Sequence, residues 1–411
     1  MPGADFGRTV ADAAAREDGA ALARLVDLQT SATRRACARG TGVQRTGAPW
    51  DDVAAHVWAA GAALFGADAA ARAPADTWHA AHDAMERALA AFLRLFAALA
   101  PGRWALPALD ALLRDALWIA HGADDAAAHA ARGAAHTHTH LEACARALNK
   151  AFSACAADRY PALAQSKKWG AYAVANRLLR VYFSLRSTAL CKNVLRALGA
   201  AELPPLEAYP RAERVTFDYY VGRLAFLDED YTTAETRLAA ALGAAPARAT
   251  RHIERILVYL IAVRLLRGVR PREACFAAHP RLAALYAPVV AACWAGDVRA
   301  YDAALAEPAR ERTLVRLGVY LALERARDVC VTRLGRRVWA LAGRGTRLRL
   351  ALFADALRWL HGGALSAAEA EWALATLIAK GRVKGYIAHE RQTLVLSATD
   401  PFPAPTLAML S

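Results

Sequence analysis

The sequence lacks any long apolar run. Its longest runs, such as LVYLIAV at 257–263, end at arginines and are far shorter than the roughly 20 residues of a membrane-spanning helix. The first residues, MPGADFGRTV, also lack the basic and apolar regions of a secretory signal. We therefore expect a protein without membrane contact.

Cysteine is sparse and follows no pattern. The chain has seven cysteines, and none of them forms a CxxC pair. An odd, scattered set excludes a disulfide scaffold and is typical of reduced thiols in the cytosol or nucleus.

The short motifs of common catalytic sites are also missing. The sequence has no GxxxxGK[ST] phosphate loop, no GxGxxG, no GxSxG elbow and no HExxH. We therefore expect a protein that is not an enzyme, with no catalytic residue and no cofactor. A Cys–His arrangement formed only in the folded chain is not excluded by sequence.

One histidine run stands out: His136, His138 and His140 in AAHTHTHLEA. On a helix, residues two apart point to different faces, whereas on a strand all three would share one face. The run follows Gly133 and precedes a helical stretch, so a solvated turn is one interpretation and a zinc site is the other. The spacing favours the turn, and we expect no metal site.

Alanine and arginine are abundant. Hydrophobic residues make up 56% of the chain; their excess over an average protein is mostly alanine, with 106 residues, and alanine is the best helix former. The 52 basic residues exceed the 38 acidic ones by 14, and only six of the basic residues are lysine. This composition indicates a basic, all-α protein with an anionic partner.

Helical periodicity continues to about residue 380 and includes one clear repeat. VTFDYYVGRLAFLDEDYTTAETRLAAALGAAP carries small, aromatic and proline residues at the spacings of one tetratricopeptide-type (TPR) repeat. Small residues let two antiparallel helices approach, and the proline ends the second helix. Degenerate helical pairs follow. The six repeat positions are Gly222, Tyr231, Ala234, Leu238, Ala241 and Pro246.

The pattern changes after residue 308. Two helices, at 311–326 and 329–343, precede a short extended RLRL at 347–350 and a helix through ALFADALRWL. Ser366 and Glu369 then form a capping box, and the strands VKGYIA and TLVLS close the segment around a turn at 389–392. This is the element order of a winged helix.

Four longer segments resemble one known family: QSKKWG at 165–170, ERVTFDYYVGRLAFLDEDYTTAE at 213–235, ILVYLIAVRLLRG at 256–268 and GRVKGYIAHERQTLVLSATDPFP at 381–403. They look like the PCI domain-containing subunit of the nuclear mRNA-export transcription-and-export complex two, in the signalosome-twelve-like group. KKWG, DYYVGR and VKGYI are specific to that group. Residues 30–80 and 121–140 do not match its pattern.

The resemblance implies a PCI fold: an all-α helical-repeat (TPR-like) solenoid ending in a winged helix with a small β-hairpin. We expect an N-terminal helical region at 1–158, repeats at 159–308, a winged helix at 309–400 and a tail at 401–411, with the PCI domain at about 212–400.

The resemblance also implies partners. It implies a non-catalytic adaptor that binds a GANP-type scaffold protein through the winged helix and a small acidic Dss/Sem-type protein along the repeats. RNA or DNA would bind without sequence specificity. The expected location is the nucleus and the nuclear pore, with the cytoplasm as a second location. The alternative is a purely structural PCI scaffold of a signalosome- or splicing-linked assembly, without nucleic-acid binding.

The charge distribution points to the same end of the chain. Residues 310–391 carry 16 basic and 7 acidic residues, a balance of +9. Such a surface would neutralise phosphates irrespective of sequence, although arginine-rich faces are also often only solvated. Tyr386 is either a base-stacking platform or half-buried packing. Trp372 lies off its helix's apolar stripe and is a candidate partner contact. The candidate nucleic-acid residues are Arg333, Arg336, Arg337, Arg347, Arg349, Lys380, Arg382, Lys384 and Tyr386.

Overall fold

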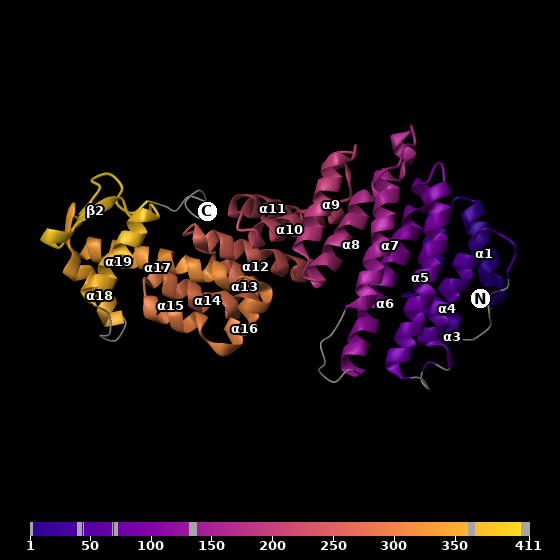
Figure 1. The fold of residues 1–411 in the computed structure, drawn as a ribbon, viewed down its shortest axis with the longest axis horizontal. Coiled ribbons are helices and arrows are strands. Elements are labelled where there is room, and N and C mark those ends of the chain that lie inside the picture. Colours follow the sequence, from indigo (N-terminus) through magenta and orange to yellow (C-terminus); the bar gives the residue numbers. More distant parts are fainter. Residues whose placement is uncertain are drawn as a thin grey trace. The chain divides into compact units, whose positions relative to one another are not determined.

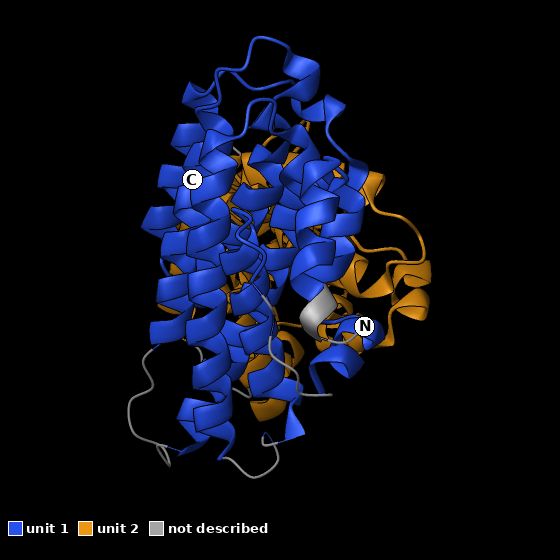
Figure 2. Ribbon diagram, turned by 90° about the vertical axis from the view of Figure 1, so that its right-hand side faces the viewer, with its two compact units in different colours: residues 1–217 blue, residues 218–411 orange. Residues whose placement is uncertain are grey.

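The computed structural model describes residues 3–38, 43, 45–67, 69, 73–130, 138–360 and 366–403. It divides into two compact units, residues 1–217 and 218–411 (Figure 2). Among the described residues, none of the helices is long and apolar enough to cross a membrane.

The first unit is a set of antiparallel helices (Figure 1). Short 3₁₀ turns precede α6 and α8. The chain breaks between the first two helices, because Glu17 has a φ of 53° and Asp18 then caps a new helix by accepting a 2.8 Å hydrogen bond from the Ala21 amide. The helices are α1 Gly3–Ala15, α2 Gly19–Val26, α3 Ser31–Ala38, α4 Asp51–Phe65, α5 Pro74–Ala98, α6 Leu106–Ala130, α7 Thr139–Ala156, α8 Ala171–Ser184, α9 Thr188–Ala200 and α10 Arg211–Leu227, which continues into the second unit.

A buried carboxylate links two parts of this unit. Asp115 on α6 is fully buried and accepts hydrogen bonds from the Leu28 amide (2.7 Å) and the Gln29 side chain (2.8 Å). Burial raises the pKa of Asp115 to about 6, although these donors and Arg114 act against the rise. The Asp115 carboxylate therefore holds the segment that follows α2 against α6.

The second unit begins with helical hairpins and confirms the TPR-type repeat. Tyr231, Ala234, Leu238 and Ala241 are all buried. Gly222 is needed because a Cβ there would lie 2.8 Å from Leu238 Cγ and 3.1 Å from the Leu238 amide nitrogen. The helices are α11 Tyr231–Ala244, α12 Thr250–Leu266, α13 Glu273–Ala278, α14 Pro280–Ala295, α15 Val298–Leu305, α16 Pro308–Leu317 and α17 Tyr320–Leu341.

The two helices expected at 311–326 and 329–343 have a different boundary. The break lies at Gly318, which adopts a left-handed φ of 75° and ends α16. From Tyr320 to Leu341 the chain is one continuous helix, α17. The expected break near Ala326 was wrong, because alanine and arginine favour a continuous helix. Gly318, in contrast, adopts the left-handed conformation that ends one.

The winged helix has the expected element order. β1 Arg347–Arg349 leads into α18 Leu350–Leu360, and the Ser366–Glu369 capping box opens α19 Ala367–Ala379. The hairpin strands are β2 Gly385–Ala388 and β3 Thr393–Leu396. The antiparallel sheet has the order β1-β3-β2 and covers a core that includes Phe353, Leu374 and Leu394. The predicted fold class is therefore confirmed; the predicted 158/159 and 308/309 boundaries stay predictions.

We expect Gly222→Ala to lower the free energy of unfolding by about 1–3 kcal/mol, because Leu238 offers backbone as well as side-chain atoms to the new methyl group. Gly243→Ala, at a helical position with no heavy atom within 4 Å of the new Cβ, is the matched control and should raise it by about 0.5–1 kcal/mol. Urea unfolding followed by circular dichroism measures both. Equal stability of the two variants would contradict the close helix approach.

Candidate nucleic-acid and partner-binding surface

The three strands place basic residues on the side of the sheet that faces solvent. Arg347, Val395 and Tyr386 form one row across the sheet, and directly opposed residues point to the same side. The next row, Leu348, Leu394 and Ile387, points the other way, where Leu348 and Leu394 are buried. The arginine rows therefore face outward.

Four residues make up this surface, which we call the sheet face: Arg347, Arg349, Lys384 and Tyr386. Arg349 is exposed two residues after Arg347, and Lys384 is exposed two residues before Tyr386. The backbone of Lys384 extends the sheet, since its carbonyl accepts a 2.8 Å hydrogen bond from the Ser397 amide. The Tyr386 side chain is 62% exposed, so the half-buried packing considered for it is wrong.

Two other candidate nucleic-acid residues, Lys380 and Arg382, lie in different surroundings. Lys380 is half exposed and forms a 2.6 Å ion pair with Asp328. Arg382 is only 2% exposed, and its Nη1 atom has no hydrogen-bond partner among the described residues. Burial lowers the pKa of Arg382. Its assignment to a nucleic-acid surface is therefore corrected, because a side chain inside the winged helix does not reach a phosphate outside it.

The candidate arginines of α17 also differ in their exposure to solvent. The guanidinium of Arg333 lies 4.1 Å from the ring centroid of Trp294 and is partly buried there. Arg336 and Arg337 are exposed on the following turn. Of the three candidate arginines on this helix, Arg336 and Arg337 therefore present their charge openly to solvent, whereas Arg333 does not.

Two tryptophans of the winged helix are exposed. Trp372 on α19 is 73% exposed, and Trp359 on α18 is 80% exposed. Trp359 lies off the buried stripe of α18, which includes Phe353, Leu357 and Leu360. Large exposed aromatic side chains are enriched at protein interfaces, so both are candidate partner contacts.

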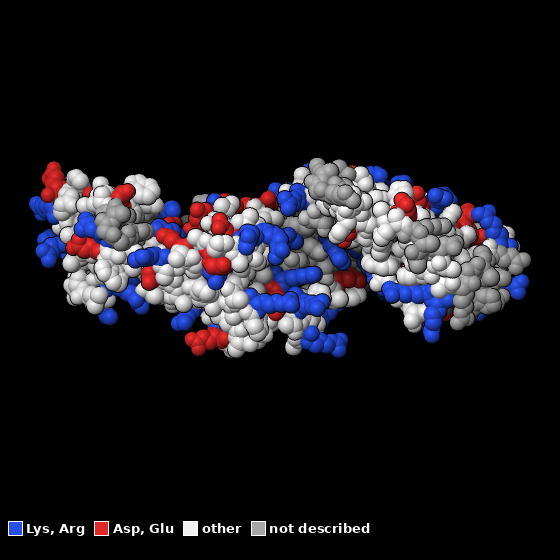
Figure 3. All heavy atoms as spheres, turned by 90° about the horizontal axis from the view of Figure 1, so that it is seen from below, with Lys and Arg blue, Asp and Glu red and all other residues white. Residues whose placement is uncertain are grey.

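A second basic surface lies in the helical repeats. A cleft of about 710 Å³ is formed by α12, α14 and α16, and arginines line it. Figure 3 shows Lys and Arg side chains gathered on the face of these repeats. Arg310 donates a 2.6 Å hydrogen bond to the Ala304 carbonyl, while its buried Nε atom has no hydrogen-bond partner among the described residues. The cleft, which we call the arginine cleft, is lined by Arg251, Arg255, Arg281, Arg310 and Arg316 together with Glu254, Glu307 and smaller residues.

The histidine run is only partly described, and His136 lies outside the described residues. His138 Nδ1 lies 3.8 Å from Asp124 Oδ2. His140 Nδ1 lies 2.8 Å from Asp124 Oδ1, and the His140 side chain is mostly buried in the first turn of α7. The solvated turn therefore does not describe His140.

The chain is similar to proteins from fungi and animals. It is 46% identical over 345 residues to the CSN12 homolog of Mycosarcoma maydis, covering 79% of this chain and 75% of that protein. The identity is 34% to the CSN12 homolog of Neurospora crassa (86% and 84% covered) and 32% to PCI domain-containing protein 2 of Xenopus laevis (76% of each). No family model matches the chain.

The chain belongs to the family of PCI-domain scaffold proteins named CSN12 and PCI domain-containing protein 2. The resemblance drawn from KKWG, DYYVGR and VKGYI is thereby confirmed. In this family the helical repeats and the winged helix are parts of one PCI fold.

Sequence reasoning missed three features of these surfaces. Trp359 could have been found by the argument that selected Trp372, since it too lies off an apolar stripe. Arg391 is exposed in the turn between β2 and β3 and was not selected. The arginine cleft combines residues from three separated helices, so no local pattern indicated it.

We expect Arg382→Glu to lower the free energy of unfolding by about 3 kcal/mol or more, because it places a carboxylate in a buried site near Asp328. Lys384→Glu, two residues away and exposed, is the control and should change it by about 0.5 kcal/mol or less. Thermal unfolding of the two variants checks this. Equal unfolding temperatures would show that Arg382 is at the surface.

Proposed function

We propose that the chain is a non-catalytic adaptor subunit of a nuclear-pore-associated mRNA export complex and binds nucleic acid through the sheet face. The observation that carries this proposal is the row of Arg347 and Tyr386 on the outer side of the sheet, with Arg349 and Lys384 beside it. Membership in the PCI-domain family supports the role of a complex subunit.

The chemistry of the sheet face suits single-stranded RNA. Arg347 and Tyr386 lie on the two outer strands, separated by β3, so their backbones are about 10 Å apart. That separation lets the guanidinium groups bind phosphates while the exposed ring of Tyr386 stacks on a base. Neither Arg347 nor Arg349 forms an ion pair with another described side chain, so their charges are available to a ligand.

The arginine cleft suits a different anionic partner. Its five arginines exceed its two glutamates, and apolar residues such as Leu282 and Leu285 lie between them. An acidic peptide with occasional apolar side chains fits such a lining better than a bare polyphosphate. We propose this cleft as the binding site of the small acidic Dss/Sem-type protein.

The scaffold partner is assigned to the winged helix. Trp359 and Trp372 are exposed on consecutive helices that contact each other. Burying such aromatic side chains contributes most of the free energy in many interfaces. We propose that a GANP-type scaffold protein covers them, and that this places the complex at the nuclear pore.

One observation favours the alternative, a structural scaffold without nucleic-acid binding. Several basic residues of the winged-helix end already have partners within the chain: Lys380 pairs with Asp328, Lys384 lies 4.0 Å from Asp400, and Arg333 stacks on Trp294. These contacts reduce the charge available for phosphate. The experiment below separates the two functions.

We expect the variant Arg347→Glu/Arg349→Glu/Lys384→Glu to bind a single-stranded RNA at least tenfold more weakly than the wild type at low salt. The slope of log affinity against log salt concentration should become less steep by about 2, since three phosphate contacts are lost. Fluorescence anisotropy titrations over a range of salt concentrations measure both quantities.

The matched control reverses the same number of charges at exposed positions of the first unit, Arg8→Glu/Arg16→Glu/Arg24→Glu. It should retain most of the affinity. If both triple variants lose affinity equally, net charge alone explains the binding and the sheet face has no special role. If the wild type does not bind RNA at all, the structural scaffold is the better account.

A further inference from the structure

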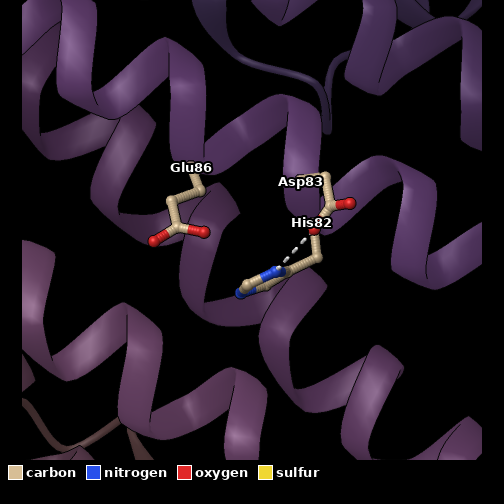
Figure 4. A group of neighbouring side chains, drawn as sticks. All are labelled: His82, Asp83 and Glu86. Atoms are coloured by element: carbon tan, nitrogen blue, oxygen red, sulfur yellow. Dashed lines mark ion pairs between the residues drawn. The ribbon is translucent and has the colours of Figure 1, made fainter.

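A group of polar side chains on α5 is used by neither the sheet face nor the arginine cleft. One possible ligand atom each from His82, Asp83 and Glu86 lies within 4.8 Å of the others. Figure 4 shows the Glu86 carboxylate directed toward the His82 ring, with Asp83 beside it. The pocket that His82 and Glu86 line is small and otherwise apolar. Accessible carboxylates of this kind are common without a bound ion, so we assign this group no ligand.

Exposed apolar side chains gather at another place, the turn between α16 and α17. Leu321 at the start of α17 is 66% exposed, Val315 near the end of α16 is 58% exposed, and Leu227 at the end of α10 is 38% exposed. The Leu227 side chain reaches this turn, because a Cβ atom at Gly318 would lie 3.3 Å from Leu227 Cδ2. We call Leu227, Val315 and Leu321 the turn patch.

The ending of α16 does not explain why these side chains are apolar. Gly318 ends the helix in a Schellman motif, and its amide donates a 3.0 Å hydrogen bond to the Val315 carbonyl. The Val319 amide donates a second 3.0 Å bond to the Leu314 carbonyl. The apolar pair that accompanies such a motif is Leu314 and Val319, and both are buried. Val315 and Leu321 lie outside this pair and leave apolar surface in water that a partner can cover.

Acidic residues flank the turn patch, although the whole chain has a net charge of +14. On α16 and on α17, an acidic residue lies three or four positions from the apolar residue of the patch, which places the two on one helix face. On the turn between α10 and α11, three consecutive acidic residues follow Leu227, and all three are exposed. The acidic rim consists of Asp228, Glu229, Asp230, Glu311 and Glu324.

The rim remains negative after its basic neighbours are counted. Residues 227–230 and 311–325 hold five acidic and three basic residues, a balance of −2. Glu229 Oε2 lies 2.8 Å from Arg325 Nη2, which neutralises one of the five carboxylates. Burial raises the pKa of Tyr320, and the carboxylates of Glu311 and Glu324 add to the rise. These two carboxylates therefore act together on the residue that precedes Leu321.

We propose that the turn patch is the docking site of a cationic segment of a partner protein, in which two or three apolar side chains lie beside lysine or arginine. The apolar side chains of the segment cover the turn patch, and its basic side chains pair with the acidic rim. RNA and acidic peptides carry the charge that the rim repels. The turn patch thus differs from the sheet face and the arginine cleft, and the inference does not depend on their ligands.

The test titrates the full chain into a fluorescent helical peptide that has leucines on one face and lysines on the other. Because the net positive charge of the chain repels this peptide elsewhere, saturable binding reports a local acidic surface. We expect Leu227→Ser/Val315→Ser/Leu321→Ser to weaken binding about tenfold or more. Glu311→Lys/Glu324→Lys should weaken it about fivefold or more. Neither variant should change the affinity for the same peptide with glutamate in place of lysine.

The matched control removes three exposed apolar side chains elsewhere, Leu163→Ser/Leu190→Ser/Val269→Ser, and should bind the leucine–lysine peptide like the wild type. Circular dichroism should be unchanged in both triple variants, since they alter exposed side chains. A photoreactive benzoylphenylalanine at position 321 should cross-link to the peptide, and one at position 190 should not.

Three results would overturn the proposal: no binding of the leucine–lysine peptide to the wild type, equal loss of affinity in the two triple variants, or no cross-link at position 321. A wild-type dimer in light scattering that the turn-patch variant abolishes would also overturn it, because a second copy of the chain would then be the occupant.

Discussion

The candidate RNA surface depends on one constraint, the pairing register of β3 with its two neighbours. Arg347 opposes Val395, and Val395 opposes Tyr386, so these residues share the outer side. Leu348 and Leu394 occupy the inner side, where they are buried. Because side chains alternate along a strand, a slip of one residue would turn the arginines into the core and the leucines into water. Apolar burial thus fixes the register, and the register positions the charge.

The helical repeats position charge by another route. Small side chains such as Gly222 and Ala234 let neighbouring helices approach closely. The arginine cleft then forms where α12, α14 and α16 present long cationic side chains around small and apolar ones. The chain therefore carries two basic surfaces of different shape: a flat sheet with an exposed aromatic ring, and a cleft with apolar lining. That difference is the physical reason for assigning them to different anionic partners.

Local patterns predicted much of the fold. The Ser366–Glu369 capping box, the two hairpin strands and the glycine of the TPR-type repeat depend on residues close in sequence, and all are present. Burial of a long side chain depends on the elements that pack over it. The sequence therefore predicted Arg382 to be exposed like Lys380 and Lys384, although it is buried. The contact between the His79 and His140 side chains could not be predicted for the same reason, since 61 residues separate them in the sequence. Both features depend on tertiary packing, which the periodicity of neighbouring residues does not encode.

The central claim is that RNA and an acidic protein bind at separate surfaces. It is tested most directly by measuring RNA affinity while a glutamate-rich peptide occupies the arginine cleft. The peptide concentration should saturate the wild type but not the cleft variant Arg251→Glu/Arg255→Glu/Arg281→Glu. The account predicts an RNA dissociation constant within about twofold of the peptide-free value, since both ligands bind at once. A competitive loss of RNA binding, in proportion to peptide occupancy, would contradict it.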